Sequence, residues 1–215
     1  MLLGFRRLAA DRVVSAALAV DVIAMAFGMP AALFPDLARH LSGATASDPA
    51  DSAMILGLLY AAYPAGVVAL GLVSGTFTRL RRPGALLIGA AQLWGLSVIL
   101  AGLSGNPALT LVALTVGGAA NLVLSTCRTT ITQTRTDDEV RGRVQGALTV
   151  VRFGGPQAAV LLHGLAGSVL GPRLGIGLGG LLTVTGLVLI QVRAPQLWHY
   201  GGQTTIAPRR TGGRS

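Results

Sequence analysis

The sequence predicts an all-α membrane protein with six transmembrane helices, and three observations lead to this fold class. Hydrophobic residues make up 52% of the 215 residues and charged residues only 12%, which is too little polar surface to coat a water-soluble core. The apolar stretches reach the ~20 residues that a helix needs to cross the hydrocarbon layer. They lack a strict apolar–polar alternation, so helices rather than a barrel are expected to satisfy the backbone groups in lipid.

The apolar stretches divide the chain into a short basic lead, six spans and a tail. The lead covers residues 1–12, the six-helix domain covers 13–193, and a disordered tail rich in Gly, Thr and Arg is expected over 194–215. The first apolar stretch is longer than the ~7–15 residues of a secretory signal, so we expect an uncleaved helix. The spans are expected at about 13–33, 53–77, 84–104, 107–127, 144–170 and 174–192.

Turn signals separate these spans. Pro30 and Pro35 are expected to end the first span, and a polar loop to follow over 34–52. The second span contains Pro64, where a kink is expected. A basic turn that includes Arg79 follows it, and a Ser-Gly-Asn-Pro turn at 104–107 divides the next uncharged stretch into two helices.

Six charged side chains lie within the nine residues Arg135–Arg143, between two apolar stretches. A charge at the centre of a bilayer costs at least ~2.5–3.5 kcal/mol, so this cluster is predicted to be a loop at the membrane surface. Six spans place both termini on one side of the membrane. If that side is the cytoplasm, the outer loops keep only Arg39 and Arg173, in agreement with the positive-inside rule.

Charge and composition narrow the function classes. The net charge of +9 falls at the ends of the apolar stretches, which is typical of a protein facing an anionic inner leaflet and not of nucleic-acid binding. Cys127 is the single cysteine, no histidine pair has metal-ligand spacing, and no catalytic constellation occurs. No enzyme, cofactor or metal is therefore expected. The Gly-rich runs, such as Gly117-Gly118, are interpreted as close helix contacts, because no strand precedes them and no Lys follows.

The charged cluster reads TDDEVRGRV over 136–144 and resembles the T-P-D-E-x-R-G-R-V loop between the tenth and eleventh helices of the major facilitator superfamily. The stretch 20–35 is similar to the seventh helix of its drug and enterobactin exporters, and GLLYAA at 57–62 to the eighth. Asp137 stands where the family has Pro, and the basic turn at 78–83 lacks the acidic residue of the family's helix 8–9 loop. The resemblance implies one six-helix half, helices seven to twelve, with a three-plus-three inverted repeat dividing near residue 105.

Charged and polar residues within the spans are the candidates for transport. Asp21 is a candidate for proton coupling or for binding a cationic solute, and its alternative role is a structural partner for an Arg or a backbone group. Arg152 lies at a similar depth in the fifth span and could pair with Asp21, or extend to the inner headgroups. Three amide side chains could line a polar path or bond between helices: Gln92, Asn121 and Gln157.

The resemblance assigns a cytoplasmic gating role to Glu139, Arg141, Arg143 and Arg79, which would hold helix ends together in one state of the cycle; the alternative is solvated loop charge. His163 is expected to be an interfacial residue near the outer end of its helix rather than a sensor. The Gly154-Gly155-Pro156 segment could bend during gating or form a static kink.

Two functions are compatible with the sequence. In the first, the chain is one half of a transporter in the cell (inner) membrane that exports a drug-like or siderophore-like solute with proton coupling, and it requires an N-terminal half or a second copy of itself. In the second, it is a truncated, non-transporting remnant or an accessory subunit that binds another membrane protein. The expected partners are the lipid bilayer, a small-molecule solute and an N-terminal half or a second copy, and no nucleic acid.

Overall fold

The computed structural model describes residues 11–43, 49–73, 82–134 and 138–201, and for parts of the segment 138–152 it describes the backbone alone. Within these ranges every regular element is a helix, which confirms the all-α expectation. The elements are α2 (Arg12–Gly28), η1 (Ala31–Leu33), α3 (Phe34–Leu41), α4 (Pro49–Val73), α5 (Pro83–Leu103), α6 (Pro107–Thr134), α7 (Asp138–Leu170), α8 (Pro172–Arg193) and α9 (Pro195–Trp198).

Five of the described stretches are long and apolar enough to cross a membrane: Arg12–Leu41, Ala50–Val73, Pro83–Leu103, Pro107–Thr134 and Pro172–Arg193. Helix α7 is not among them, although its 33 residues give it ample length. Gly, Pro and Gln at 154–157 and His163 lower its apolar character. The sixth span and the inverted repeat therefore stay predictions.

Local signals explain where the helices begin. The Asp11 side chain accepts a hydrogen bond from Val13 N at 2.8 Å and so caps α2. Helices α4, α5, α6, α8 and α9 each begin with a proline, whose fixed φ suits the first helical turn and whose missing N–H has no partner there anyway. These prolines account for most of the helix starts.

Three segments have a different secondary structure from the one that the sequence predicts. Phe34–Leu41, expected as a polar loop, is helix α3, because Pro35 fits a first helical turn and Leu37 is buried. The charged cluster is helical from Asp138 onward rather than a loop. Acidic residues begin α7, and the helix dipole favours negative charge at a helix N-terminus. Part of the expected disordered tail forms α9, because Leu197 is fully buried in the core.

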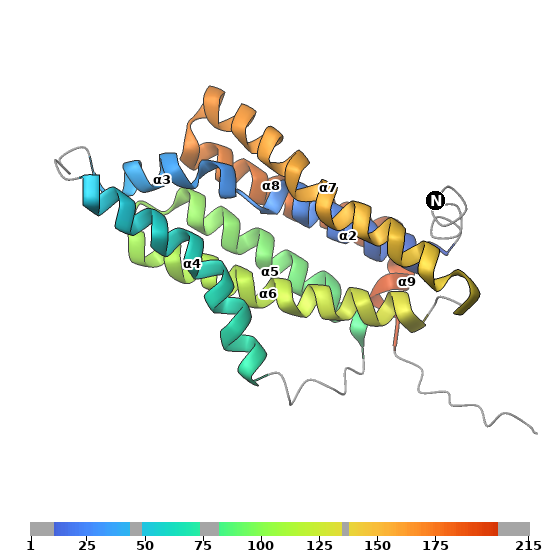
Figure 1. Ribbon diagram of the computed structural model, residues 1–215. Helices are drawn as coiled ribbons and strands as arrows, with labels where there is room; N and C mark the ends of the chain where they lie inside the picture. The colour runs from blue at the N-terminus through green and yellow to red at the C-terminus, as the bar shows by residue number, and fades with distance from the viewer. Residues whose placement is uncertain (1–10, 44–48, 74–81, 135–137, 202–215) are drawn as a thin grey trace, which may run out of the picture.

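The long helices form two groups that lie side by side (Figure 1). Helix α6 packs against α4 and α5 in one group, and α8 packs against α2 and α7 in the other; α5 and α8 join the two groups. Helix α4 contains Pro64 and changes direction near its middle. Helices α4 and α7 lie at the outside of this arrangement, so each exposes a long apolar face.

Glycines allow the helix backbones to touch. A Cβ placed on Gly118 of α6 would overlap the carbonyl group of Tyr63 on α4, with 2.9 Å to its carbon atom. A Cβ on Gly66 of α4 would lie 2.8 Å from the carbonyl carbon of Thr115. Because apolar burial does not drive helices together in lipid, such close contacts supply the attraction. The interpretation of the glycine runs as packing surfaces agrees with these contacts.

We expect Gly118→Ala to lower the thermal unfolding midpoint of the detergent-solubilised chain, because a methyl group there must separate α4 from α6, at a cost of about 1–3 kcal/mol. Gly57→Ala on α4 is the matched control, since a Cβ at Gly57 meets nothing within 4 Å. It should leave the midpoint unchanged or raise it. Equal midpoints for the two variants would contradict the close contact.

Candidate functional site

The centre of the candidate site is an ion pair buried between α2 and α6. An Oδ2 atom of Asp21 accepts from Nη1 of Arg128, and the two side chains are 1% and 4% exposed. Opposite charges in a low-dielectric interior attract strongly, but both lose their hydration, so such a pair persists only when its geometry is good. A charge without a partner would be far more costly at this depth. The pair therefore ties α2 to α6.

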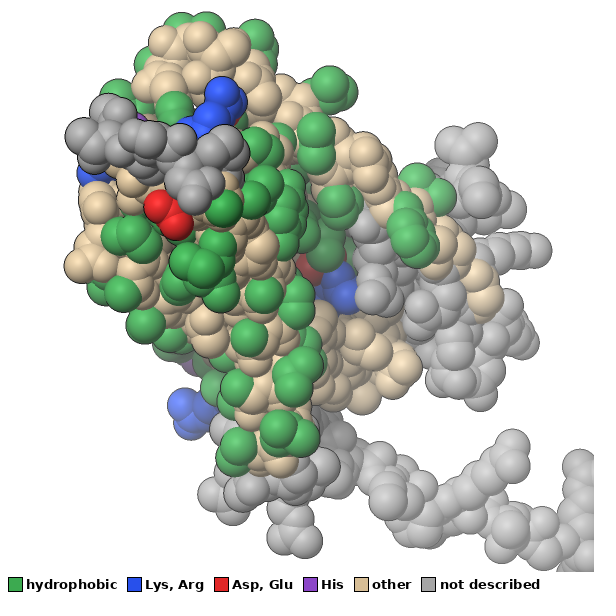
Figure 2. Space-filling view, turned by 60° about the vertical axis from the view of Figure 1, so that its left-hand side comes forward, with side chains coloured by type: hydrophobic (Ala, Val, Ile, Leu, Met, Phe, Trp, Pro, Cys, Tyr) green, Lys and Arg blue, Asp and Glu red, His purple; other side chains and the backbone are tan. Residues whose placement is uncertain are grey.

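The surroundings of the pair are tightly packed. Val20 and Ala24 on α2, and Leu124 and Cys127 on α6, are buried. One turn beyond Arg128, the Thr132 hydroxyl donates to the Arg128 carbonyl at 2.8 Å and is itself buried. In the space-filling view, an acidic and a basic side chain are visible together in a hollow of a face that is otherwise largely apolar (Figure 2).

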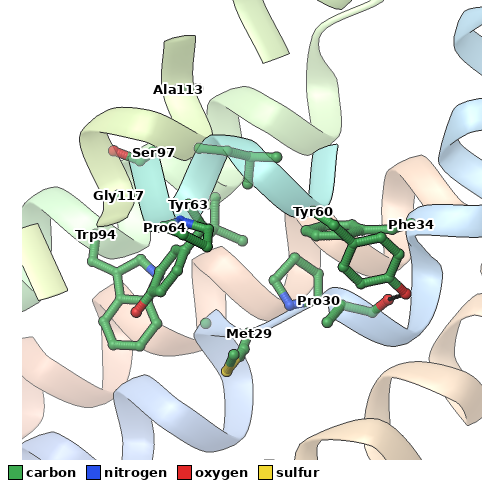
Figure 3. Close-up of a pocket in the computed structure, with 14 residues that line it drawn as sticks. Met29, Pro30, Phe34, Tyr60, Tyr63, Pro64, Trp94, Ser97, Ala113 and Gly117 are labelled. Carbon is green, nitrogen blue, oxygen red and sulfur yellow. Dashed lines mark hydrogen bonds between the residues drawn. The ribbon is translucent and has the colours of Figure 1, made fainter. Parts of the chain in front are cut away.

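A cavity of about 140 Å³ lies at the break between α2 and α3. Its walls come from η1 and five α-helices and are almost entirely apolar. Four aromatic side chains dominate the view in Figure 3: Phe34, Tyr60, Tyr63 and Trp94. An apolar cavity of roughly 150 Å³ stays dry and accepts a molecule the size of benzene. The cavity can therefore hold an aromatic ring or a similar apolar group.

The aromatic side chains are held in position by one another and by the backbone. The rings of Phe34 and Tyr60 meet edge to face, with centroids 5.3 Å apart, and the rings of Tyr63 and Trp94 are 6.1 Å apart. The Tyr60 hydroxyl donates to the carbonyl of Ala31 at 3.3 Å. Such aromatic pairs contribute about 0.5–1.5 kcal/mol beyond the area they bury, so the cavity walls are preorganised.

The cavity and the ion pair lie on the same two helix faces. Gly28 lines the cavity seven residues after Asp21, and Gly117 lines it eleven residues before Arg128. Both separations return to the same face of a helix, at distances of roughly 10 and 16 Å along the axes. An occupant of the cavity would therefore lie farther along the same helix faces than the ion pair.

The other candidates are distributed more widely. Gln92 on α5 donates to Gln191 on α8 at 3.2 Å. Asn121 on α6 is half-buried, and Gln157 on α7 is exposed. The structure thus brings none of these three amides into contact with Asp21 through a described hydrogen bond. Glu139, Arg141, Arg143 and Arg152 belong to α7, but their side chains lie outside the described part, as does Arg79 entirely.

Sequence reasoning missed Arg128, which directly follows the fourth span as expected at about 107–127. Helix α6 continues to Thr134, so Arg128 lies inside the helix and faces α2. The available signal was the lack of any Gly or Pro between Asn121 and Arg135, which left nothing to end the helix. Among the described residues, no group of His, Cys, Asp and Glu side chains is arranged to hold a metal ion.

We expect Asp21→Asn and Arg128→Gln each to destabilise the solubilised chain by about 3–5 kcal/mol, because each leaves one buried charge without its partner. The double variant should cost clearly less than the sum of the two, and a double-mutant cycle on denaturant unfolding measures this difference. The exposed pair between Asp36 and Arg39 is the control, and Asp36→Asn should cost no more than about 1 kcal/mol. If the losses in unfolding free energy caused by the Asp21 and Arg128 substitutions simply add in the double variant, the two side chains are not coupled.

Comparison with known proteins identifies the relatives of this chain. No family model matches it. It is 30% identical to the enterobactin exporter EntS of Escherichia coli K12 over 202 residues, which cover 93% of the chain and 46% of the exporter. The same values hold for EntS of Escherichia coli O9:H4, and EntS of Citrobacter koseri is 30% identical over 140 residues, or 65% of the chain and 34% of the exporter.

The chain spans about half the length of the curated relatives it matches. The match runs through most of the described helices, including those that carry the ion pair and the aromatic cavity. Together with the apolar helices of transmembrane length, it makes the chain a multi-pass membrane protein. This chain is therefore a relative of the enterobactin exporters of the major facilitator superfamily.

Proposed function

We propose that the chain forms one six-helix half of a proton-coupled exporter that carries a drug-like or siderophore-like solute out of the cell. The observation that carries this proposal is the Asp21–Arg128 ion pair, buried on the same helix faces as an aromatic cavity. A membrane protein keeps charges in its interior at a high energetic cost, so intramembrane ion pairs commonly mark a transport route. The relatives named as enterobactin exporters support the same direction of transport.

The cavity suggests how a solute would be recognised. Its apolar walls and its volume of about 140 Å³ suit one ring of a larger aromatic solute rather than the whole molecule. The remainder of the solute would then lie outside this half. Asp21 is the proposed coupling residue, because protonation of its carboxylate would release Arg128 from its partner and loosen α2 from α6.

The outer surfaces of the half support the need for a companion. Of the five candidate spans, α4 is the least covered, with 17% of its most apolar window buried against 39–56% for the others. In transporters of this superfamily the solute cavity lies between two halves that rock against each other. The chain would therefore work with an N-terminal six-helix half or with a second copy of itself.

The topology in this proposal has α7 as the fifth span, three-plus-three inverted repeats, and both termini in the cytoplasm. The contacts of α4 with α6 and of α7 with α2 support the repeats, because exchange of the two three-helix units would interchange these contacts. In such a topology the charged start of α7 lies at the cytoplasmic face. Glu139, Arg141, Arg143 and Arg79 are the proposed gating residues there, and Arg152, Asn121, Gln92 and Gln157 remain proposed solute- or proton-path residues.

The second candidate is an accessory subunit or remnant that binds another membrane protein without transporting a solute. The exposed apolar faces of α4 and α7 favour this alternative to the same degree, since they would bind a neighbouring protein of any function. The ion pair distinguishes the two candidates. In an accessory subunit, Asp21 would matter for stability alone.

The test is efflux of a fluorescent aromatic dye from vesicles that contain the chain with the six N-terminal helices of an enterobactin exporter. We expect an imposed proton gradient to drive efflux, and Asp21→Asn to reduce it about tenfold or more, in the range that loss of one coupling interaction of 1.4 kcal/mol or more produces. Asp36→Asn, which alters an exposed ion pair, is the matched control and should transport normally. Dye movement that ignores the gradient, or is unchanged in folded Asp21→Asn protein, would favour the accessory role.

A further inference from the structure

His163 is a buried histidine that the proposed site does not use. It lies on α7, with 3% of its surface exposed. Its Nδ1 atom is 2.9 Å from the carbonyl oxygen of Ala159, one turn earlier on the same helix. Its Nε2 atom is 3.1 Å from the carbonyl oxygen of Phe27 on α2. Each ring nitrogen thus faces a carbonyl group, one within α7 and one across to α2.

The chemistry of these two contacts determines the charge of the ring. A carbonyl oxygen accepts hydrogen bonds and cannot donate them. A neutral imidazole carries a single N–H, and its other nitrogen is an acceptor, so it can make one of the two bonds but not both. The imidazolium form has an N–H on each nitrogen and makes both. The arrangement is therefore satisfied only when His163 is protonated.

We propose that His163 is a proton-binding site of this chain, and that the bound proton fastens α7 to the end of α2. In this state both ring N–H groups donate to carbonyl oxygens. When the proton leaves to water, one nitrogen presents a lone pair to a carbonyl oxygen 3.1 Å or less away, which is repulsive. The contact between α7 and α2 then opens. This inference adds a second proton-binding residue to the proposed proton-coupled exporter, and its coupling role rests on that function.

The surrounding structure makes room for the ring. A Cβ at Gly179 of α8 would lie 2.6 Å from Nε2 of His163 and would also overlap the carbonyl oxygen of Phe27. Glycine at this position therefore permits the contact between α7 and α2. Phe27 is in the last turn of α2, just before the break at Met29 and Pro30, where helix carbonyl groups lack their usual amide partners. A charged N–H is a suitable donor for such a carbonyl.

Charged side chains on the elements packed against the ring are six or more positions along the chain from its contact points, and η1 has none. On α2, Asp21 is bonded to Arg128; on α8, Arg173 donates to the carbonyl of Leu103. The full set is Arg12 and Asp21 on α2, Arg173 and Arg193 on α8, and Asp138, Glu139, Arg141, Arg143 and Arg152 on α7. The two carbonyl groups are thus the immediate electrostatic environment of the ring.

The other two histidines serve as internal references. His40 and His199 are exposed. The Nδ1 atom of His199 also faces a carbonyl one turn earlier, that of Pro195, at 2.9 Å. The bond within α7 is therefore an ordinary helical feature, and the contact of Nε2 with Phe27 is what distinguishes His163.

The first measurement counts the protons on the ring in the unaltered chain. ¹⁵N-histidine NMR of the purified chain in lipid resolves three histidines, and His40→Gln and His199→Gln assign the signals by elimination. We expect both nitrogens of His163 to be protonated whenever α7 and α2 are in contact. A ring with one protonated nitrogen while the two helices remain in contact would overturn the proposal, and this result needs no variant of His163.

The second measurement reports the contact itself. A Cβ at Gly155 of α7 would lie 3.7 Å from the Cβ of Met25 on α2, which matches the spacing in a disulfide of about 3.8 Å. Met25→Cys with Gly155→Cys, in a Cys127→Ser background, therefore reports α2–α7 proximity by the yield of oxidation. We expect the yield to fall about twofold or more over the pH range in which the NMR signals show the ring losing its proton. Thiol chemistry alone would raise the yield over this range, because thiolates are the reactive form.

His163→Gln should remove this fall, and Gly179→Ala should weaken the contact at every pH by displacing the ring. Gly177→Ala on the same helix is the matched control, because a Cβ there makes an ordinary 3.4 Å contact with Leu103. An equal fall in yield with and without His163 would overturn the proposal. Neither measurement uses a solute, so absence of transport alongside the expected NMR and cross-linking results would count against the proposed function alone.

Discussion

The buried ion pair between Asp21 and Arg128 is the interaction on which this arrangement of helices depends. Charges in an apolar interior are tolerated only in pairs, so the pair fixes the faces that α2 and α6 turn toward each other. With these faces set, Gly28 and Gly117 both border the aromatic cavity. A polar interaction thus determines where an apolar site can form.

The remaining helix contacts follow a different rule. Lipid tails are as apolar as leucine side chains, so burial of leucines does not select among helix arrangements in a membrane. Close backbone approach does, and each of α4, α5, α6 and α8 has glycines where helices touch, although Gly57 of α4 and Gly89 of α5 are not among them. Gly95 on α5 and Gly180 on α8 are one such pair, in which a Cβ on Gly180 would lie 2.8 Å from the carbonyl oxygen of Gly95. These contacts hold the two helix groups together by close packing of the backbones, without polar side chains.

Helix α2 combines both kinds of contact. It carries the ion pair at Asp21, the accepting carbonyl of Phe27 and the break at Met29 and Pro30 that borders the cavity. Within residues 21–30, this segment therefore contacts α6, α7 and the cavity. A proton gained or lost at Asp21 or at His163 would therefore change a contact of the segment that borders the cavity. The proposed proton coupling requires such an arrangement.

Composition and local signals were enough to predict an all-helical membrane protein. Apolar stretches of membrane-spanning length leave helices as the solution in lipid, and prolines such as Pro83, Pro107 and Pro172 mark helix starts through local backbone geometry. Asp21 was identifiable as a candidate because a charge inside an apolar stretch is unusual, whatever its partner in the folded chain. These inferences depend on neighbours along the chain.

The partners of these residues depended on the tertiary structure. Asp21 and Arg128 are 107 residues apart in the chain, and His163 and Phe27 are 136 apart, so no local pattern connects them. Arg128 was assigned to a helix end because charges usually mark one. His163 was expected at the membrane interface, and its burial was not predicted because it depends on Gly179 of another helix. The sequence by itself determined which segments become membrane helices. Only packing decided which face of each helix meets which neighbour, because that choice is made by contacts between distant residues.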